Sequence, residues 1–204
     1  MFFFVIEGLD GSGKGTQVKL LMDYFKEKSV PFEFIKSPNY ETPVGKVYKK
    51  YLDEEIEMKA DAVFLLLATD VIMNKPKIEK ARKKGEVILA ERYITSTIAF
   101  QCANGFPFKK AVRFIELMEY PKPDLIIFID VRPEVGMKRK LKQGKLDRHE
   151  KSLEFLKKVR KFYLREIKEN ILGKWVVVNG EKSIEDVQEK ILKIIETNLE
   201  LSKR

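Results

Sequence analysis

The sequence contains one cysteine, Cys102, and one histidine, His149, in 204 residues. A lone cysteine forms no internal disulfide, and a lone histidine without cysteine neighbours is a poor basis for a zinc site. No apolar run reaches the roughly 18 residues of a membrane span. The apolar stretch before Glu7 is too short for a secretory signal, and acidic residues follow it. We therefore expect a cytoplasmic protein that does not contact a membrane.

The composition is typical of one folded domain with a basic surface. Hydrophobic residues make up 44% of the chain and charged residues 35%, which supports a core and argues against disorder. The length suits a single α/β domain, residues 1–204. The net charge of +9 favours anionic partners, but charge alone does not separate nucleotides from nucleic acid.

Apolar runs alternate with longer segments that have helical spacing. Val18, Leu21 and Phe25, for example, recur at intervals of three and four residues. The apolar runs lack polar alternation, which predicts strands buried on both faces. They lie at residues 2–7, 32–36, 87–90, 125–131 and 175–179. This order predicts an α/β fold of three layers (α/β/α), in which helices flank a five-stranded parallel sheet.

The most specific motif lies directly after the first expected strand. It consists of Gly8, Leu9, Asp10, Gly11, Ser12, Gly13, Lys14, Gly15 and Thr16. The glycines let the backbone curl so that several N–H groups face phosphate oxygens, and the following helix adds its positive end. Lys14 would reach the β- and γ-phosphates of a nucleoside triphosphate. We interpret the stretch as an ATP-binding phosphate loop (P-loop) rather than an ordinary glycine-rich turn.

One position of this loop departs from the usual pattern. The residue after the lysine usually carries a hydroxyl that binds Mg²⁺, and here it is Gly15. Thr16 points about 100° away around the helix and does not simply replace it. We therefore expect phosphate oxygens, water and an acidic residue from elsewhere to hold Mg²⁺.

Two charged residues follow the third expected strand. Glu91 and Arg92 lie at its carboxyl end, the edge of a parallel sheet where ligands bind. Glu91 could bind Mg²⁺ directly or through its water shell, and Arg92 could bridge donor and acceptor phosphates. On spacing alone, an ordinary salt bridge at a strand end explains the pair equally well.

A basic connection at residues 142–150 could close over the triphosphate as a short lid. It follows Lys138, Arg139 and Lys140, and Gly144 lies within it. A solvated basic helix end is the alternative, and composition alone supports that alternative better.

Several motifs together resemble the thymidylate kinase family of P-loop nucleoside monophosphate kinases. They run in order along nearly the whole chain: the phosphate loop at 7–14, the signature Glu91-Arg92-Tyr93 through Gln101, the strand at 123–130, the lid motif Lys145-Leu146-Asp147-Arg148 and the last strand-to-helix turn at 179–187. The Arg-Tyr signature is specific only in combination with the phosphate loop.

The resemblance implies transfer of the γ-phosphoryl group of ATP to dTMP, with Mg²⁺, by a homodimer. By position, the catalytic residues would be Lys14, Glu91, Arg92 and, in the lid, Arg148. Asp10 would bind the 3′-hydroxyl of the acceptor and Arg92 its phosphate. The rest of the acceptor site would include Ser96, Phe100, Gln101, Phe64 and Leu67.

The residues expected around the acceptor base differ from the family pattern. Where the family has a phenylalanine that stacks on thymine, this chain has Leu67, with Phe64 one turn earlier. Where it has a thymine-reading arginine four residues later, this chain offers Asp70 or Val71, and Tyr40 replaces an arginine of the acceptor loop. A carboxylate accepts hydrogen bonds and suits an amino-bearing base better than thymine. We therefore hypothesise an altered or relaxed base preference.

Two alternatives remain open from the sequence. Gly13-Lys14-Gly15-Thr16-Gln17 also resembles adenylate kinases, which favours a nucleoside monophosphate kinase for another base. The second alternative is a non-catalytic binder of nucleotides or nucleic acid. The chain lacks the clustered aromatic and basic residues that stack on bases, so we expect no nucleic acid partner. It also lacks the Asn-Lys-x-Asp motif of GTPase switches.

Overall fold

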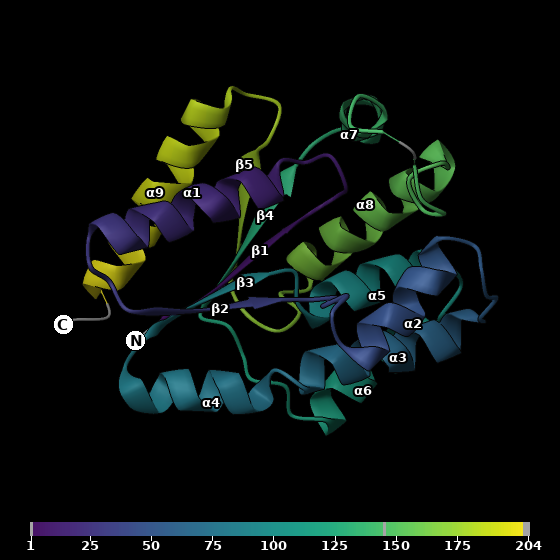
Figure 1. The fold of residues 1–204 in the computed structure, drawn as a ribbon, viewed down its shortest axis with the longest axis horizontal. Helices are drawn as coiled ribbons and strands as arrows, with labels where there is room; N and C mark the ends of the chain where they lie inside the picture. The colour runs from purple at the N-terminus through teal and green to yellow at the C-terminus, as the bar shows by residue number, and fades with distance from the viewer. Residues whose placement is uncertain (1, 145, 202–204) are drawn as a thin grey trace.

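The computed structural model describes residues 2–144 and 146–201 and has a parallel sheet at its centre (Figure 1). The strands are β1 Phe3–Gly8, β2 Phe32–Lys36, β3 Val87–Glu91, β4 Leu125–Asp130 and β5 Trp175–Asn179. They lie in the order β2-β3-β1-β4-β5, and every pairing is parallel. The carboxyl ends of all five strands therefore meet at one edge of the sheet.

Helices connect the strands in the described part of the chain. They are α1 Lys14–Glu27, α2 Pro43–Leu52, α3 Ala60–Ile72, α4 Lys75–Lys84, α5 Ile94–Ala103, α6 Phe108–Leu117, α7 Pro133–Leu141, α8 Leu153–Lys168 and α9 Ile184–Leu201. None of these helices, within the described residues, is long and apolar enough to cross a bilayer.

The sheet separates two layers of helices, because neighbouring strand residues face opposite sides. Phe3 and Val5 of β1 pack with side chains of α3, α4, α5 and α6. Phe4 and Ile6 pack instead with side chains of α1 and α9. Figure 1 shows α1 and α9 on one face of the sheet and α5 and α8 on the other. The predicted three-layer α/β fold with five parallel strands is confirmed.

The prediction that the strands are buried on both faces is confirmed for the central strands and is wrong for the edge strands. Every residue of β1 is buried, whereas β2 and β5 have one buried residue each. An edge strand has a neighbour on one side only and less cover from helices. The central strand boundaries also differ from the prediction by one residue: β1 runs from Phe3 to Gly8, β3 ends at Glu91 and β4 ends at Asp130.

The segments expected to carry function lie at the carboxyl edge of the sheet. The P-loop follows β1, and Arg92 follows β3, the neighbour of β1. The connection expected to form a lid, residues 142–150, runs between α7 and α8. Lys145 of its motif lies outside the described residues, as do residues 1 and 202–204 of the expected domain.

Candidate active site

The P-loop, residues 8–16, forms a tight turn between β1 and α1. Gly11 and Gly13 have φ angles of 77° and 92°, which residues with side chains rarely adopt. A Cβ atom on Gly11 would also lie 2.2 Å from the carbonyl oxygen of Gly136, so the loop touches α7 closely. A curled backbone of this kind at the start of a helix can hold an anion.

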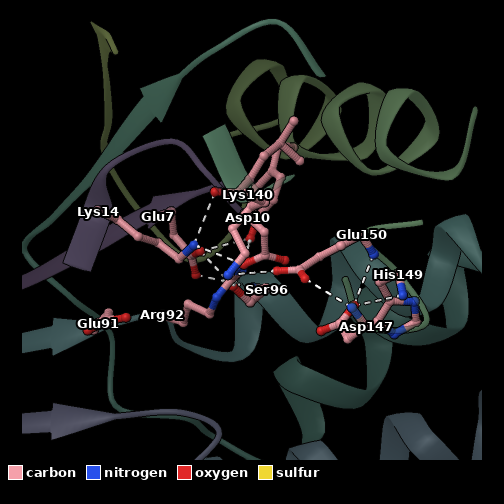
Figure 2. A network of polar contacts seen from close by, with 12 residues as sticks. Glu7, Asp10, Lys14, Glu91, Arg92, Ser96, Lys140, Asp147, His149 and Glu150 are labelled. Atoms are coloured by element: carbon pink, nitrogen blue, oxygen red, sulfur yellow. Dashed lines mark hydrogen bonds and ion pairs between the residues drawn. The ribbon is translucent and has the colours of Figure 1, made fainter. Parts of the chain in front are cut away.

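Three charged side chains meet beside the loop (Figure 2). Arg92 Nη2 donates to Asp10 Oδ1 at 2.7 Å, and Lys14 Nζ donates to the same oxygen at 3.3 Å. Lys14 Nζ also donates to the carbonyl oxygen of Leu9 at 3.1 Å. The structure thus brings together the P-loop lysine and the arginine that follows β3.

Burial and mutual charge shift the pKa values of this group. Burial and the Arg92 charge lower the pKa of Lys14 to about 8, against the opposite effect of Asp10. Burial alone would raise the pKa of Asp10, but Arg92 and Lys14 hold it well below its usual value. Burial alone would lower the pKa of Arg92, and the Asp10 carboxylate outweighs that effect and raises it. At neutral pH the three side chains therefore carry a net positive charge, which suits phosphate.

Glu7, a fully buried carboxylate in β1, caps the start of α5. Its Oε1 accepts hydrogen bonds from the Tyr93 and Ser96 N–H groups at 3.0 and 3.2 Å and from the Thr95 hydroxyl at 2.7 Å. The first N–H groups of a helix have no partner within the helix. Glu7 accepts from the N–H group of the N-cap residue Tyr93 and shares that of Ser96 with the Tyr93 carbonyl oxygen, and it so fixes α5 against β1.

Glu7 also holds Arg92 through two hydroxyl groups. Its Oε2 accepts hydrogen bonds from Ser96 Oγ at 2.6 Å and from the Tyr163 hydroxyl at 2.8 Å. Both hydroxyls in turn accept from Arg92 Nη1, at 2.9 and 3.2 Å. From the sequence we assigned no role to Glu7. The available signal was a carboxylate at the end of an otherwise apolar strand.

A cavity opens beside the Asp10–Arg92 pair and is bounded by α3, α5 and the connection between α7 and α8. We call it the acceptor cavity. Of the residues expected to bind the acceptor, it is lined by Asp10, Arg92, Ser96, Phe100 and Leu67. Phe100 also supports the guanidinium of Arg92, which lies 5.0 Å from its ring centroid. The cavity and the P-loop therefore share Asp10 and meet at the Asp10–Arg92 pair.

Phe64 and Gln101 do not line this cavity, contrary to our expectation. The Phe64 ring is fully buried in the core and stacks on Phe106, with 4.3 Å between the ring centroids. Leu67, three residues later on the same helix, forms the cavity wall instead. Gln101 is fully buried, and neither atom of its amide has a hydrogen-bond partner among the described residues.

Glu91 lies beside the P-loop and forms an ion pair with Lys36 at 3.2 Å. Its Oε1 is 3.8 Å from the position that a Cβ atom would take on Gly15. Glu91 thus offers an oxygen close to the place of the missing hydroxyl, while Thr16 is exposed. Oxygen is the ligand that Mg²⁺ prefers, and Mg²⁺ usually keeps several waters. These residues fit a magnesium ion held through few protein contacts.

Arg148 does not approach the P-loop in this structure. Its guanidinium lies over the Tyr51 ring at 4.3 Å, donates to the Tyr51 carbonyl oxygen at 2.9 Å and pairs with Glu57 at 2.8 Å. These partners belong to α2 and the segment after it. The expected catalytic position of Arg148 is therefore not the position seen here, because Tyr51 of α2 and Glu57 in the segment after it hold the side chain there.

A second arginine, Arg139 of α7, contacts the backbone of the P-loop. Its Nη1 donates to the carbonyl oxygens of Gly11 at 3.3 Å and Gly180 at 3.0 Å. The sequence indicated only a basic run before the lid. Helical spacing distinguishes Arg139 from the other basic residues of this run. Arg139 lies one turn after Gly136 and so on the same face of α7, and Gly136 is the residue that touches Gly11.

Two more buried polar groups line the acceptor cavity, Asp70 and His149. Burial raises the pKa of Asp70, and the Asn39 N–H group, which donates to Oδ1 at 3.2 Å, and the Ser37 hydroxyl only partly offset this. The His149 ring stacks on Phe155 with 4.6 Å between centroids, and its Nε2 has no hydrogen-bond partner among the described residues. Burial lowers the pKa of His149 to about 4, so the ring is neutral at pH 7.

Comparison with known proteins gives one consistent family. The family model described as thymidylate kinase matches residues 6–191. A probable thymidylate kinase of Archaeoglobus fulgidus is 36% identical and covers 97% of this chain and 96% of its own. A thymidylate kinase of Fervidobacterium nodosum is 32% identical, with coverage of 97% and 100%.

A solved structure leads to the same family. The thymidylate kinase of Candida albicans, described as having broad substrate specificity, matches with a TM-score of 0.78 and 28% identity. The match covers 97% of this chain and 92% of that chain. The resemblance seen in the motifs is thus confirmed over nearly the whole length, and the chain belongs to the thymidylate kinase family.

Proposed function

We propose that this protein is an ATP-dependent thymidylate kinase, which transfers the γ-phosphoryl group of ATP to dTMP and releases ADP and dTDP. The observation that carries this proposal is the Asp10–Arg92 ion pair at 2.7 Å, which joins the P-loop to the acceptor cavity. A donor phosphate on the loop and an acceptor phosphate in the cavity would meet at this pair. The family and its relatives support the choice of nucleotides.

The side chains at this junction suit the needs of phosphoryl transfer, which are positioning and charge neutralisation. Lys14 and the N–H groups of the loop would hold the donor triphosphate. Arg92 would bind the acceptor phosphate, and Asp10 the acceptor 3′-hydroxyl. The acceptor phosphate itself supplies the attacking oxygen, so no side chain needs to act as a nucleophile.

We propose Mg²⁺ as the cofactor of the donor nucleotide. Glu91 would hold it, directly or through water, and a bound Mg²⁺ neutralises charge on the triphosphate. Lys36 now pairs with Glu91, and its side chain is 50% exposed. An ion pair with one half-exposed partner is weak, so Glu91 can exchange Lys36 for the metal.

We propose that residues 142–150 act as a lid that brings Arg148 to the transferring phosphate. Glu57, the partner that holds Arg148 at α2, has a side chain that is 76% exposed. Because an ion pair with so exposed a partner contributes little stability, the arginine can leave it when phosphate charge becomes available. Closure would also exclude water that otherwise hydrolyses ATP. An Arg148→Met variant should lose turnover more than ATP affinity.

We also propose that the single domain works in the cytoplasm as a homodimer. Leu65 on α3 and Leu117 on α6 are 53% and 71% exposed and line the same apolar surface hollow. Association would cover these side chains. Light scattering should then give twice the chain mass of 23.8 kDa.

Lys14→Met and Arg92→Met test the proposed function, with Lys158→Met, at an exposed position of α8, as the control. ADP formation with ATP, Mg²⁺ and dTMP should fall by about two to four orders of magnitude in the first two variants, because each removes a phosphate-binding cation. The control should keep wild-type turnover. Near-normal turnover of both site variants would refute the assignment.

A further inference from the structure

The acceptor cavity has more acidic than basic side chains on its walls. Its carboxylates are Asp10, Asp70 and Asp147, and Arg92 is the only permanent cation among its described lining residues. Arg92 pairs with Asp10. Asp147 accepts two backbone N–H groups of its own turn at 2.9 Å. The charge of Asp70 is stabilised by two neutral groups, the Asn39 N–H group and the Ser37 hydroxyl.

Asp70 is held so that one of its oxygens stays free. The residue is 2% exposed, and its Oδ1 accepts the Asn39 N–H group at 3.2 Å. Its Oδ2 is buried and meets no donor in hydrogen-bonding geometry among the described residues, and the Ser37 hydroxyl nearby stabilises the carboxylate from the side of the cavity wall. Buried carboxylate oxygens normally have a hydrogen-bond donor, so an orphan in the wall of a ligand cavity indicates a donor on the ligand.

We propose that Asp70 Oδ2 accepts a hydrogen bond from an amino group on the acceptor base, so that the enzyme phosphorylates dCMP as well as dTMP. This inference rests on the proposed function, namely that the cavity binds the acceptor nucleotide. The reaction is the same: the bond from the γ-phosphorus to ADP breaks, and a bond to a phosphate oxygen of dCMP forms, which gives ADP and dCDP.

Cytosine and thymine differ at the group that a carboxylate reads. Cytosine has an exocyclic amino group that donates, where thymine has a carbonyl oxygen that only accepts. Both bases are single rings of nearly the same size, so a cavity that admits one admits the other. Leu67 and Val71, the neighbours of Asp70 on α3 in this wall, are apolar and offer the thymine oxygen no donor, and the Ser37 hydroxyl on the same wall faces the Asp70 carboxylate. Thymine keeps its ring N–H as a donor and is still bound.

The first test compares acceptors on the wild-type enzyme with saturating ATP and Mg²⁺. We expect kcat/KM for dCMP within about 100-fold of the value for dTMP, because a hydrogen bond to a charged group changes affinity by roughly 10- to 150-fold. An N4,N4-dimethyl dCMP, which has lost both amino protons, should be a poor substrate. A value for dCMP below this range, or full activity with the dimethyl compound, would overturn the proposal.

Asp70→Asn provides the sharper test, because the Asn39 N–H group sets the orientation of the new amide. The amide oxygen must take the place of Oδ1, which puts the NH₂ group where Oδ2 was. The variant therefore presents a donor to the base and should shift the dTMP/dCMP ratio of kcat/KM at least tenfold towards dTMP. Asp61→Asn makes the same change on an exposed position of the same helix and should leave the ratio unchanged.

The outcomes separate this inference from the proposed function. Turnover of dTMP with an unchanged ratio in Asp70→Asn would overturn the role of Asp70 alone and leave the kinase assignment in place. Turnover of neither nucleotide by the wild type would overturn both. Should the variant fail to fold, which its melting curve would show, the dimethyl substrate decides on the wild-type enzyme.

Discussion

Replacing Glu7 with glutamine should loosen Arg92 without touching the nucleotide. The amide oxygen has to face the three donors now at Oε1, because two of them are backbone N–H groups that cannot reverse. The new NH₂ group then faces the hydroxyls of Ser96 and Tyr163. Both hydroxyls already accept from Arg92 Nη1, so they would receive donors from two sides.

The magnitude follows from the number and kind of these bonds. Hydrogen bonds to a charged group contribute about 1.5–3 kcal/mol each and neutral ones about 0.5–1.5 kcal/mol. In Glu7→Gln the five hydrogen bonds to this side chain no longer have a charged acceptor. The two bonds from the Ser96 and Tyr163 hydroxyls lose their acceptor atom as well. Relief of the buried charge offsets part of this loss. We expect the free energy of unfolding to fall by roughly 2–4 kcal/mol.

Urea denaturation and steady-state kinetics measure the two effects separately. The kcat/KM for the acceptor should fall at least tenfold, while KM for ATP changes little, because Arg92 and not the P-loop loses its anchor. Glu189→Gln on the exposed face of α9 is the matched control. An unfolding free energy within 0.5 kcal/mol of the wild type, together with unchanged acceptor kinetics, would refute the role assigned to Glu7.

Three further predictions concern the P-loop. The pKa of Lys14, about 8 in the free protein, should rise when triphosphate binds, so that binding at about pH 9 takes up most of one proton. Calorimetry in buffers of different ionisation enthalpy measures this proton uptake, and an uptake of zero would contradict the prediction. ATP affinity should accordingly weaken as pH rises above 8. Arg139→Met should raise KM for ATP about tenfold by freeing the loop carbonyl of Gly11, whereas Lys138→Met on the same helix should not. Equal effects of the two variants would show that the contact between Arg139 and Gly11 does not matter for ATP binding. Gly11→Ala should lower the free energy of unfolding by more than about 2 kcal/mol, because Gly11 has a positive φ and the new Cβ would lie 2.2 Å from α7. Gly85→Ala, with a similar φ and open space, should lower it by about 1 kcal/mol. Similar melting temperatures of the two variants would contradict the close packing of the loop on α7.

The fold was predictable because its signals are local and repeated. Five apolar runs separated by helical segments define a parallel α/β sheet, and the P-loop marks its functional edge. What local pattern could not supply was the place of each strand in the sheet. β2 and β5 read as buried strands from composition, but they lie at the edges, where their outer sides have no neighbour.

The site was predictable where a backbone turn fixes the side chain. Asp10, Lys14 and Arg92 lie next to strand ends, so the sheet alone brings them together. Phe64 and Arg148 depended on tertiary contacts that the sequence does not display. The Phe64 ring found Phe106 in the core, and the long side chain of Arg148 found partners on α2.

The direct test of the central claim is to incubate the wild-type protein with ATP, Mg²⁺ and dTMP and to separate the nucleotides by ion-exchange chromatography. The account predicts ADP and dTDP in equal amounts, with saturation in both substrates and no dTDP when ATP or the protein is left out. ADP without dTDP, or neither product, would contradict the assignment of this site to phosphoryl transfer onto dTMP.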